Sequence, residues 1–314
     1  MANKKKWILR KVNKLKTILN SLRKKEEKMP NNALTAISEI AAFGSNDLKE
    51  YATKYLIRIN ATGEQLECYI KDAIAGSFKL PPIQKPAHYT KIFSYLGNQN
   101  NPPDMVIKNG DAFEIKKIEN PFASLALNSS PPKDVLRATD KRILDACRKC
   151  ESLPWKEKDL FYVIGNAKKG TINYLFFVQG TCYAANHDVY DKVHEPLKRE
   201  IDSTLASLEL DKVKTVELGK VKRVDPLGIT ELRIRGMWNI DNPLSVFKNM
   251  CSIKGEGKFY MFALMKKDKF YSFPKEDIKK IESNKALIVS DVKIPDPNNP
   301  AKMLDAKLIT YIQK

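Results

Sequence analysis

The sequence predicts an α/β fold in which a mixed central β-sheet carries helices on both faces. A β-hairpin is indicated between residues 104 and 118, because two short apolar runs flank the turn-forming pair Asn109-Gly110. Residues 159–164 and 171–179 are rich in β-branched and aromatic side chains, which is typical of central strands. Residues 63–78 place apolar side chains on one face of a helix, and such a helix can cover a sheet.

The composition indicates a protein with a polyanionic partner. The 314 residues carry a formal net charge of +18, and an excess of this size favours DNA or RNA as the partner. Hydrophobic residues make up 43% of the chain, which is enough for a substantial core. The longest apolar runs are too short for a membrane span, so none is expected, and a membrane surface is a less favoured partner than a nucleic acid.

The cysteines indicate a reducing compartment. Their number, five, is odd, and no secretory signal precedes them, so we expect a cytoplasmic protein without disulfides. Cys147 and Cys150 form a Cys-X-X-Cys pair, but no second pair follows at zinc-finger spacing. We therefore interpret these two residues as ordinary thiols.

Residues 1–30 are predicted to form a basic amphipathic helix. Residues 1–28 hold eleven Lys or Arg and two Glu. An apolar stripe recurs at spacings of three and four, formed by Ile8, Val12, Leu15, Leu19 and Leu22. Three roles stay open for this helix: docking on the body of the protein, a short dimer seam, or a basic arm along DNA phosphates.

Helices are also expected between this segment and the hairpin. Residues 31–58 indicate one or two helices, with a break at residues 43–46. Thr62 and Gln65 have the spacing of a capping box, which predicts a helix start at Thr62. The buried face of that helix is expected to hold Leu66, Ile70, Ala73 and Ile74.

The loop of the hairpin decides which side chains share a face of the sheet. A two-residue loop at Asn109-Gly110 would pair Asp104 with Ile115. The side chain of Asp104 would then lie on the face opposite to Glu114 and Lys116. A three-residue loop, with a type I turn and Gly110 in the left-handed region, would pair position 104 with Glu114. Both loops fit the sequence. The chemistry favours the second, because it gathers Asp104, Glu114 and Lys116 on one face.

This trio of side chains predicts a metal site. Two carboxylates held close together repel each other and need a cation, and hard oxygen ligands with room for water suit Mg²⁺. The neighbouring Lys116 can align or deprotonate an attacking water and stabilise charge on a phosphorane-like transition state. We therefore expect Asp104 and Glu114 to hold the metal and Lys116 to act on the water.

Further segments after the hairpin bear on DNA contact. Asn128, Ser129 and Ser130 can hydrogen-bond without bulk and are candidates for contacts to DNA bases or sugars. The Ser-Ser-Pro-Pro stretch could equally start a helix that runs from about residue 133 to 151. A helix is predicted over residues 188–208, with Pro196 inside it or at a break. Later strands are predicted at residues 230–235, 259–264, 270–273, 286–292 and 304–312.

Two arginines are candidates for sequence recognition. Arg233 and Arg235 alternate with Leu232 and Ile234, so a strand here would present both arginines on one face and pack the apolar pair inward. The guanidinium fork matches the O6 and N7 acceptors of guanine in the major groove. Contacts to phosphates are the alternative role.

The chain resembles a known group of nucleases. Pro103-Asp104 followed by Glu114-Ile115-Lys116 is similar to the PD-(D/E)XK nuclease motif. The stretches 63–72, 125–130 and 225–238 resemble one family with this motif, the NgoPII-type restriction endonucleases. The resemblance runs from about residue 40 to about residue 260, and it does not include the first thirty residues.

The resemblance implies a fold, a reaction and partners. It implies a PD-(D/E)XK core, with residues 31–314 as one endonuclease domain whose catalytic half spans about 31–210. Residues from about 211 to 314 would add recognition and further strands. The implied reaction is Mg²⁺-dependent cleavage of double-stranded DNA at a short palindrome, with GGCC as the best candidate. A homodimer, a companion DNA methyltransferase and a bacterial cytoplasm are implied with it.

Two more site residues enter through this resemblance. The main-chain carbonyl of Ile115 would be an additional metal ligand. Glu67, on the helix that starts at Thr62, would supply an acid to the site, with Glu64 as the other candidate. A structure-specific repair or recombination nuclease of the same fold, and a DNA-binding module without catalysis, are the alternative functions.

Overall fold

The computed structural model describes residues 31–54, 62–98, 101–208 and 211–314. Residues Asn31–Lys314 form one compact unit. The basic helix predicted for residues 1–30 lies outside the described residues. In the part of the chain that the structure describes, we find no helix both long and apolar enough to cross a membrane.

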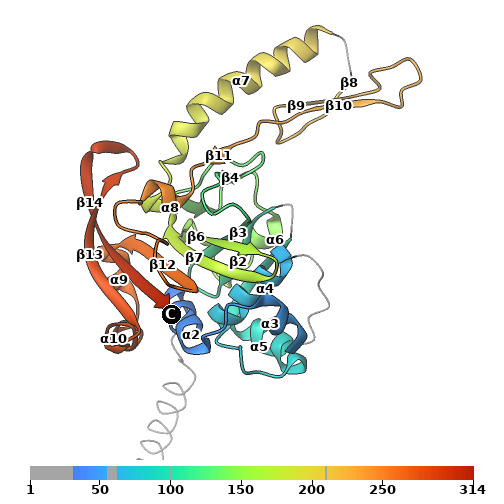
Figure 1. Ribbon diagram of the computed structural model, residues 1–314. Helices are drawn as coiled ribbons and strands as arrows, with labels where there is room; N and C mark the ends of the chain where they lie inside the picture. Colours follow the sequence, from blue (N-terminus) through green and yellow to red (C-terminus); the bar gives the residue numbers. More distant parts are fainter. Residues whose placement is uncertain (1–30, 55–61, 99–100, 209–210) are drawn as a thin grey trace, which may run out of the picture. The chain divides into compact units, whose positions relative to one another are not determined.

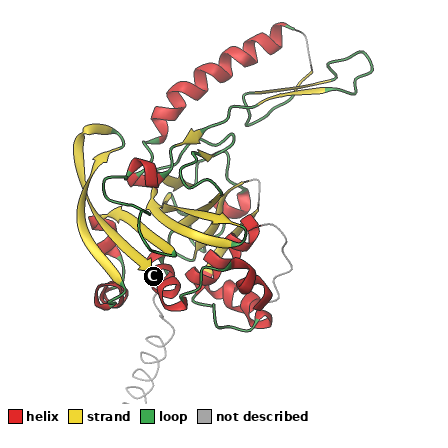
Figure 2. Ribbon diagram, viewed as in Figure 1, coloured by secondary structure: helices red, strands yellow, loops and turns green. Residues whose placement is uncertain are grey.

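A mixed β-sheet forms the centre of this unit, as predicted, with helices on both faces (Figure 1, Figure 2). Its strands are β1 (Phe93–Asn98), β2 (Asn101–Ile107), β3 (Ala112–Ile118), β5 (Val135–Arg137), β6 (Glu157–Lys168), β7 (Thr171–Gln179), β12 (Phe259–Lys266), β13 (Leu287–Asp296) and β14 (Asn299–Gln313). Their order is β1-β2-β3-β6-β7-β12-β14-β13, and β5 pairs with β6 off this path. β3 runs parallel to β6 and β7 runs parallel to β12, whereas the other neighbours are antiparallel.

Two hydrophobic clusters pack against the two faces of the sheet. Side chains alternate along β6, so Phe161 and Val163 join one cluster while Tyr162 and Ile164 join the other. The first cluster is covered by α2 (Ala33–Phe43), α3 (Leu48–Lys54), α4 (Thr62–Ala75), α9 (Lys267–Ser272) and α10 (Lys275–Ser283). The second is covered by α6 (Asp145–Arg148), α8 (Pro243–Val246) and the loops around β4 (Leu125–Ala126).

The helices before the hairpin agree with the sequence. α4 begins at Thr62, and its predicted inner residues Leu66, Ile70, Ala73 and Ile74 are all fully buried. A short 3-10 turn (Pro82–Gln84) and α5 (Lys85–Ile92) then lead into β1. The segment after α4 therefore brings the chain to the edge of the sheet, where the hairpin begins.

The hairpin has the register in which Asp104, Glu114 and Lys116 share one face of the sheet, as predicted. β2 and β3 pair Met105 with Phe113 and Val106 with Ala112, which sets Asp104 opposite Glu114. The amide of Ile107 donates to the carbonyl of Asp111 at 3.0 Å, which closes a three-residue loop. The predicted left-handed residue is wrong, because Asn109 has φ 52° and Gly110 has no positive φ. Asn tolerates this conformation since its side chain is short and polar.

Two secondary-structure predictions are also wrong. Residues 133–151 form β5, turns and the short α6 in place of one helix. The pairing of β5 with β6 holds residues 135–137 extended. Residues 270–272 form the end of α9 and residue 273 is its C-cap, so no strand forms here; Lys269 of this helix contacts Asp111 at 2.6 Å.

A helix followed by a small separate sheet forms what we call the arm, residues 187–236. It comprises α7 (His187–Ser207), which contains Pro196 as predicted, then β8 (Asp211–Lys212), β9 (Gly219–Lys222) and β10 (Glu231–Ile234). β9 is the middle strand of this sheet. A Cβ at Gly219 would approach Leu205 of α7 within 2.8 Å, so the absence of a side chain there lets β9 pack closely on α7. Leu232 was expected to pack inward but is 46% exposed.

Candidate active site

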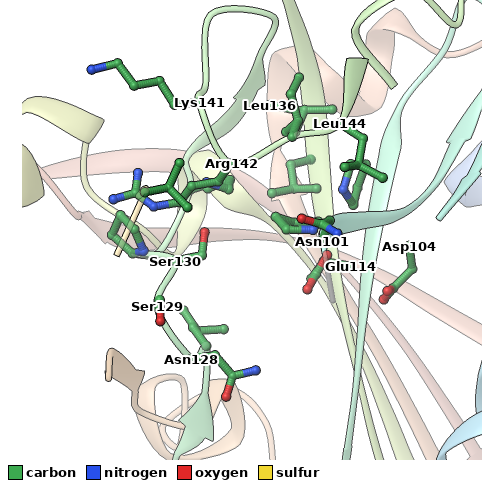
Figure 3. A pocket seen from close by; sticks show the side chains of 18 of the residues that line it. Asn101, Asp104, Glu114, Asn128, Ser129, Ser130, Leu136, Lys141, Arg142 and Leu144 are labelled. Atoms are coloured by element: carbon green, nitrogen blue, oxygen red, sulfur yellow. The ribbon is translucent and has the colours of Figure 1, made fainter. Parts of the chain in front are cut away.

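A pocket brings together side chains from the hairpin, the loop after it and the arm (Figure 3). Asp104 lies at the start of the hairpin and faces Glu114 on the neighbouring strand. Eight of the side chains predicted from the sequence line this pocket: Asp104, Glu114, Lys116, Asn128, Ser129, Ser130, Arg233 and Arg235. These residues come from segments more than a hundred positions apart, so the fold and not local sequence creates the site.

Asp104 is held by the backbone of the opposite strand. Its Oδ2 accepts a hydrogen bond from the amide of Ile115 at 2.5 Å. Burial, and next the negative charge of Glu114, raise the pKa of Asp104 to about 8. The protein without metal therefore keeps a proton on Asp104 at neutral pH. A divalent cation between the two carboxylates would displace that proton.

Glu114 and Lys116 form an ion pair on the same face. The Nζ of Lys116 donates to Oε1 of Glu114 at 2.6 Å. Burial alone would lower the pKa of Lys116, but the carboxylates of Glu114 and Asp104 outweigh it and raise this pKa above its ordinary value. Lys116 is therefore an ammonium at neutral pH, and it can donate hydrogen bonds to a water or to a phosphate oxygen.

The second oxygen of Glu114 has features of a metal ligand. This atom, Oε2, is buried and has no hydrogen-bond partner among the described residues. The described residues hold no group of three or more His, Cys, Asp or Glu side chains that could bind a metal by themselves. Mg²⁺ does not need such a cage, since it typically takes one or two carboxylates and keeps several waters. The pair of Asp104 and Glu114 fits that ion.

Glu67 lies close to this group but outside the pocket lining. It stands on α4, where its side chain is 35% exposed and its Oε1 is 4.0 Å from Nζ of Lys71. Its charge contributes to raising the pKa of both Asp104 and Lys116. The helix therefore places this carboxylate within electrostatic reach of the two residues.

The loop after the hairpin is fixed to the chain segment that follows the arm. Asn128 has a positive φ of 53°, and its carbonyl accepts from the amide of Trp238 at 2.8 Å. The amide of Leu127 donates back to the carbonyl of Trp238 at 2.9 Å. Beyond it, the hydroxyl of Ser130 is buried without a hydrogen-bond partner among the described residues.

Arg233 and Arg235 converge on a carboxylate that the sequence analysis missed. Nε of Arg233 lies 3.0 Å from Oε2 of Glu217, and Nη2 lies 2.5 Å from its Oε1. Nε of Arg235 lies 2.7 Å from the same Oε1. Hydrogen bonds from Arg233 and then Arg235 lower the pKa of Glu217. Both arginines thus share a face, as predicted, and Glu217 orients them.

A signal for Glu217 is present in the sequence, although it is visible only in hindsight. Glu217 is the one acid in residues 212–223, which hold five Lys or Arg. A lone acid in a basic segment is a candidate to orient neighbouring guanidinium groups. The pocket lining also includes Lys133, Lys141, Arg142 and Tyr162, which were not among the predicted site residues.

Comparison with known proteins shows which family the chain belongs to. The family model described as NgoPII restriction endonuclease matches residues 31–295. The chain belongs to this family. A relative, the type II restriction enzyme NgoPII of Neisseria gonorrhoeae, is 43% identical over 255 residues, which cover 81% of this chain and 90% of the relative. No solved structure was found to match the chain.

Membership of the NgoPII restriction endonuclease family confirms three predictions from the sequence. They are the family itself, the α/β fold with a mixed central sheet, and the class of enzyme, a type II restriction endonuclease. The matched region, 31–295, contains every residue of the pocket and leaves out the first thirty residues.

Proposed function

We propose that this restriction endonuclease hydrolyses double-stranded DNA at a short palindromic site, with GGCC as the candidate sequence and Mg²⁺ as the cofactor. The observation that carries the proposal is the pocket itself. It joins two acidic side chains and a lysine of nuclease-like spacing to a set of basic side chains. A site built in this way can bind a polyanion and cut it at one place.

The proposed metal ligands are Asp104, Glu114 and the main-chain carbonyl of Ile115. The partnerless Oε2 of Glu114 and the raised pKa of Asp104 support them, because both features describe carboxylates whose counter-charge is incomplete. When bound, Mg²⁺ would supply Lewis-acid polarisation of the scissile phosphate.

Lys116 is the proposed group that aligns the attacking water. Its ammonium donates hydrogen bonds, so it can hold the water in line with the phosphorus and stabilise negative charge that develops on the phosphate oxygens. Glu114 orients it through the 2.6 Å contact. Glu67 would act from α4 as an outer acid that adds negative charge near the metal, and Glu64 stays the alternative for this role.

The proposed readers of the DNA sequence are Arg233 and Arg235, with Asn128, Ser129 and Ser130 as further DNA contacts. Glu217 takes up Nε and Nη2 of Arg233 but only Nε of Arg235. Among the described residues, Arg235 therefore keeps both terminal nitrogens for a bidentate contact to guanine. We propose Arg235 as the main base-reading residue.

A palindromic site has consequences for assembly and for the host cell. Each strand needs its own cut, and two copies related by a two-fold axis would each read one half of the site. We therefore propose a homodimer that acts in the bacterial cytoplasm. A DNA methyltransferase that modifies the same site would be its functional companion, because host DNA would otherwise be cut.

Plasmid digestion tests the proposal. We expect discrete bands in the presence of Mg²⁺, no cutting with a chelator, and fragment ends that map to GGCC. Discrete bands whose ends map to another sequence would support the proposed function and assign a different recognition site. Nicking that depends on DNA structure would favour the repair nuclease, and a gel shift without cutting would favour a DNA-binding module.

A further inference from the structure

Two polar groups on the wall of the pocket lack partners among the described residues and take no part in the proposed cleavage step. The hydroxyl of Ser130 and Nε of Arg142 are both buried, and neither has a hydrogen-bond partner among the described residues. Both residues line the pocket, and Figure 3 shows them on the opposite side of the view from Asp104. Buried polar groups are usually paired, so two unpaired donors in one pocket indicate a missing acceptor.

Within the described part of the chain, the guanidinium of Arg142 has a long ion pair with Asp140 and no shorter one. The nearby carboxylate is that of Asp140, which forms a short ion pair with Nζ of Lys133. Asp140 also accepts from the main-chain amide of Arg142 at 2.8 Å. Nη1 of Arg142 is 4.0 Å from Asp140, too far for a hydrogen bond. Because Lys133 neutralises Asp140, the charge of Arg142 is available to a ligand.

A neutral histidine orients this arginine. Nη2 of Arg142 lies 3.4 Å from Nε2 of His194, which is buried on α7. A guanidinium has only donors, so Nε2 must accept, and the ring proton then lies on Nδ1. Burial, and next the charge of Arg142, lower the pKa of His194, which keeps the ring neutral. The contact therefore fixes the direction of the guanidinium without cancelling its charge.

We propose that Arg142 and Ser130 form a binding site for one phosphate of the DNA backbone, next to the scissile phosphate and separate from the metal ligands. The tetrahedral phosphate supplies several acceptor oxygens, which match the guanidinium fork and one hydroxyl. Such a contact fixes the register of the duplex in the pocket and carries no sequence information. The proposal rests on the proposed function, since it takes duplex DNA as the ligand.

Removal of a single phosphate charge tests this site. Duplexes containing the cognate site, each with one neutral methylphosphonate at a different position, are titrated without divalent metal against wild type and Arg142→Gln. We expect one position near the cut, other than the scissile phosphate, at which the methylphosphonate weakens wild-type binding about 10-fold or more. The same substitution should have no effect on Arg142→Gln, because the contact is already lost.

Two further variants separate this contact from a general loss of charge or of folding. Ser130→Ala should be as stable as wild type, because only a partnerless hydroxyl is removed. In this variant the methylphosphonate at the same position should weaken DNA binding less than it does in wild type. Lys149→Gln removes an equal charge at an exposed position outside the pocket and should keep the full effect. Arg142→Gln should also reduce the slope of log affinity against log salt by about one unit, equally for cognate and unrelated duplexes.

The outcomes distinguish failure of this proposal from failure of the proposed function. Identical methylphosphonate profiles for wild type and Arg142→Gln would overturn the phosphate site while leaving DNA cleavage intact. A loss of discrimination between cognate and unrelated duplexes in Arg142→Gln would also overturn it, since a phosphate contact cannot read sequence. If wild type neither binds nor cuts duplex DNA, the proposed function fails first.

Discussion

At the scale of single residues, the active site holds like charges close together. Asp104 and Glu114 face each other across two strands, and one ammonium, that of Lys116, lies beside them. Without a metal, the pair is relieved by a proton on Asp104, whose pKa is raised to about 8 by burial and by Glu114. The site is thus arranged for a ligand and not for stability of the empty protein.

This arrangement predicts a pH-dependent cost in stability. Below pH 4, Asp104 is protonated in both the folded and the unfolded chain. Between pH 4 and 8, only the unfolded chain would release this proton, so the free energy of unfolding decreases with rising pH. Replacement of Asp104 by the neutral Asn removes this pH-dependent loss of stability. In a chelator, the melting temperature of Asp104→Asn should therefore exceed that of wild type by a margin that grows from pH 5 to pH 8.

The exposed Asp305→Asn provides the matched control for that comparison. Its carboxylate forms a surface ion pair with Lys293 at 3.5 Å, and such pairs contribute little to stability. Its melting temperature should follow that of wild type at both pH values. A margin for Asp104→Asn that is constant or shrinks with pH would show that the carboxylates are not strained.

The residues that the sequence could predict are those whose positions follow from local periodicity. Glu114 and Lys116 share a face because they lie two apart on a strand, and loop length alone adds Asp104. Glu217 and Arg142 could not be predicted in this way. Their roles depend on contacts with residues 16 and 52 positions away, which the register of the arm and the packing of α7 create.

At the scale of elements, the turn of the hairpin sets the geometry of the whole site. Asn109 takes the left-handed conformation there, with φ 52°. A β-branched residue would be strained in this conformation by ~1–2 kcal/mol, while Gly adopts it readily. We expect Asn109→Val to lower the free energy of unfolding in urea by about that amount and Asn109→Gly to leave it nearly unchanged. Equal stabilities for the two variants would refute the turn described here.

The contacts of Glu217 in the arm predict unequal roles for the two arginines. Arg235→Ala should lower the ratio of cognate to unrelated affinity at fixed salt, with a loss of ~1–3 kcal/mol at one base pair. Arg233→Ala should have a smaller effect, because Glu217 already occupies two of its nitrogens. Arg235→Lys should not restore the ratio, since an ammonium lacks the planar fork. Titrations against the cognate duplex and its single-base variants measure these ratios.

A different pattern in those titrations would reassign the arginines. If both Ala variants lose the same affinity for every duplex, the two side chains hold only the DNA backbone. The base-reading residues would then be sought at Asn128 and Ser129, which line the same pocket.

The local sequence pattern predicted most helices and strands. It failed where tertiary contacts determine the conformation of the backbone. The strands around residues 159–179 and α7 follow from composition and periodicity. Residues 133–151 carry helix-forming side chains, but Val135, Leu136 and Arg137 pair with β6 at the edge of the sheet, which a helix could not do. Residues 270–273 have strand-like composition, yet they end α9, whose Lys269 contacts Asp111 and Asp159.

At the scale of the whole molecule, one chain offers a single set of Asp104, Glu114 and Lys116, while duplex DNA has two strands to cut. In a homodimer, a subunit that is paired with an inactive partner should therefore cut only one of the two strands. When wild type is mixed and refolded with excess Glu114→Ala, most wild-type subunits pair with an inactive partner. These heterodimers should nick one strand of a supercoiled plasmid, so open circles should accumulate. Linear product at every mixing ratio would contradict the dimer.

The central claim is that one face of the hairpin carries the chemistry, and neighbouring lysines test it most directly. Lys116 lies in the pocket, whereas Lys117 points away from it and pairs with Glu119 at 2.5 Å. Each Lys→Ala change removes the same charge one position apart. Plasmid cleavage with Mg²⁺ should continue at the wild-type rate in Lys117→Ala and be lost in Lys116→Ala, which should still bind the cognate duplex. Wild-type cleavage by Lys116→Ala would contradict the account.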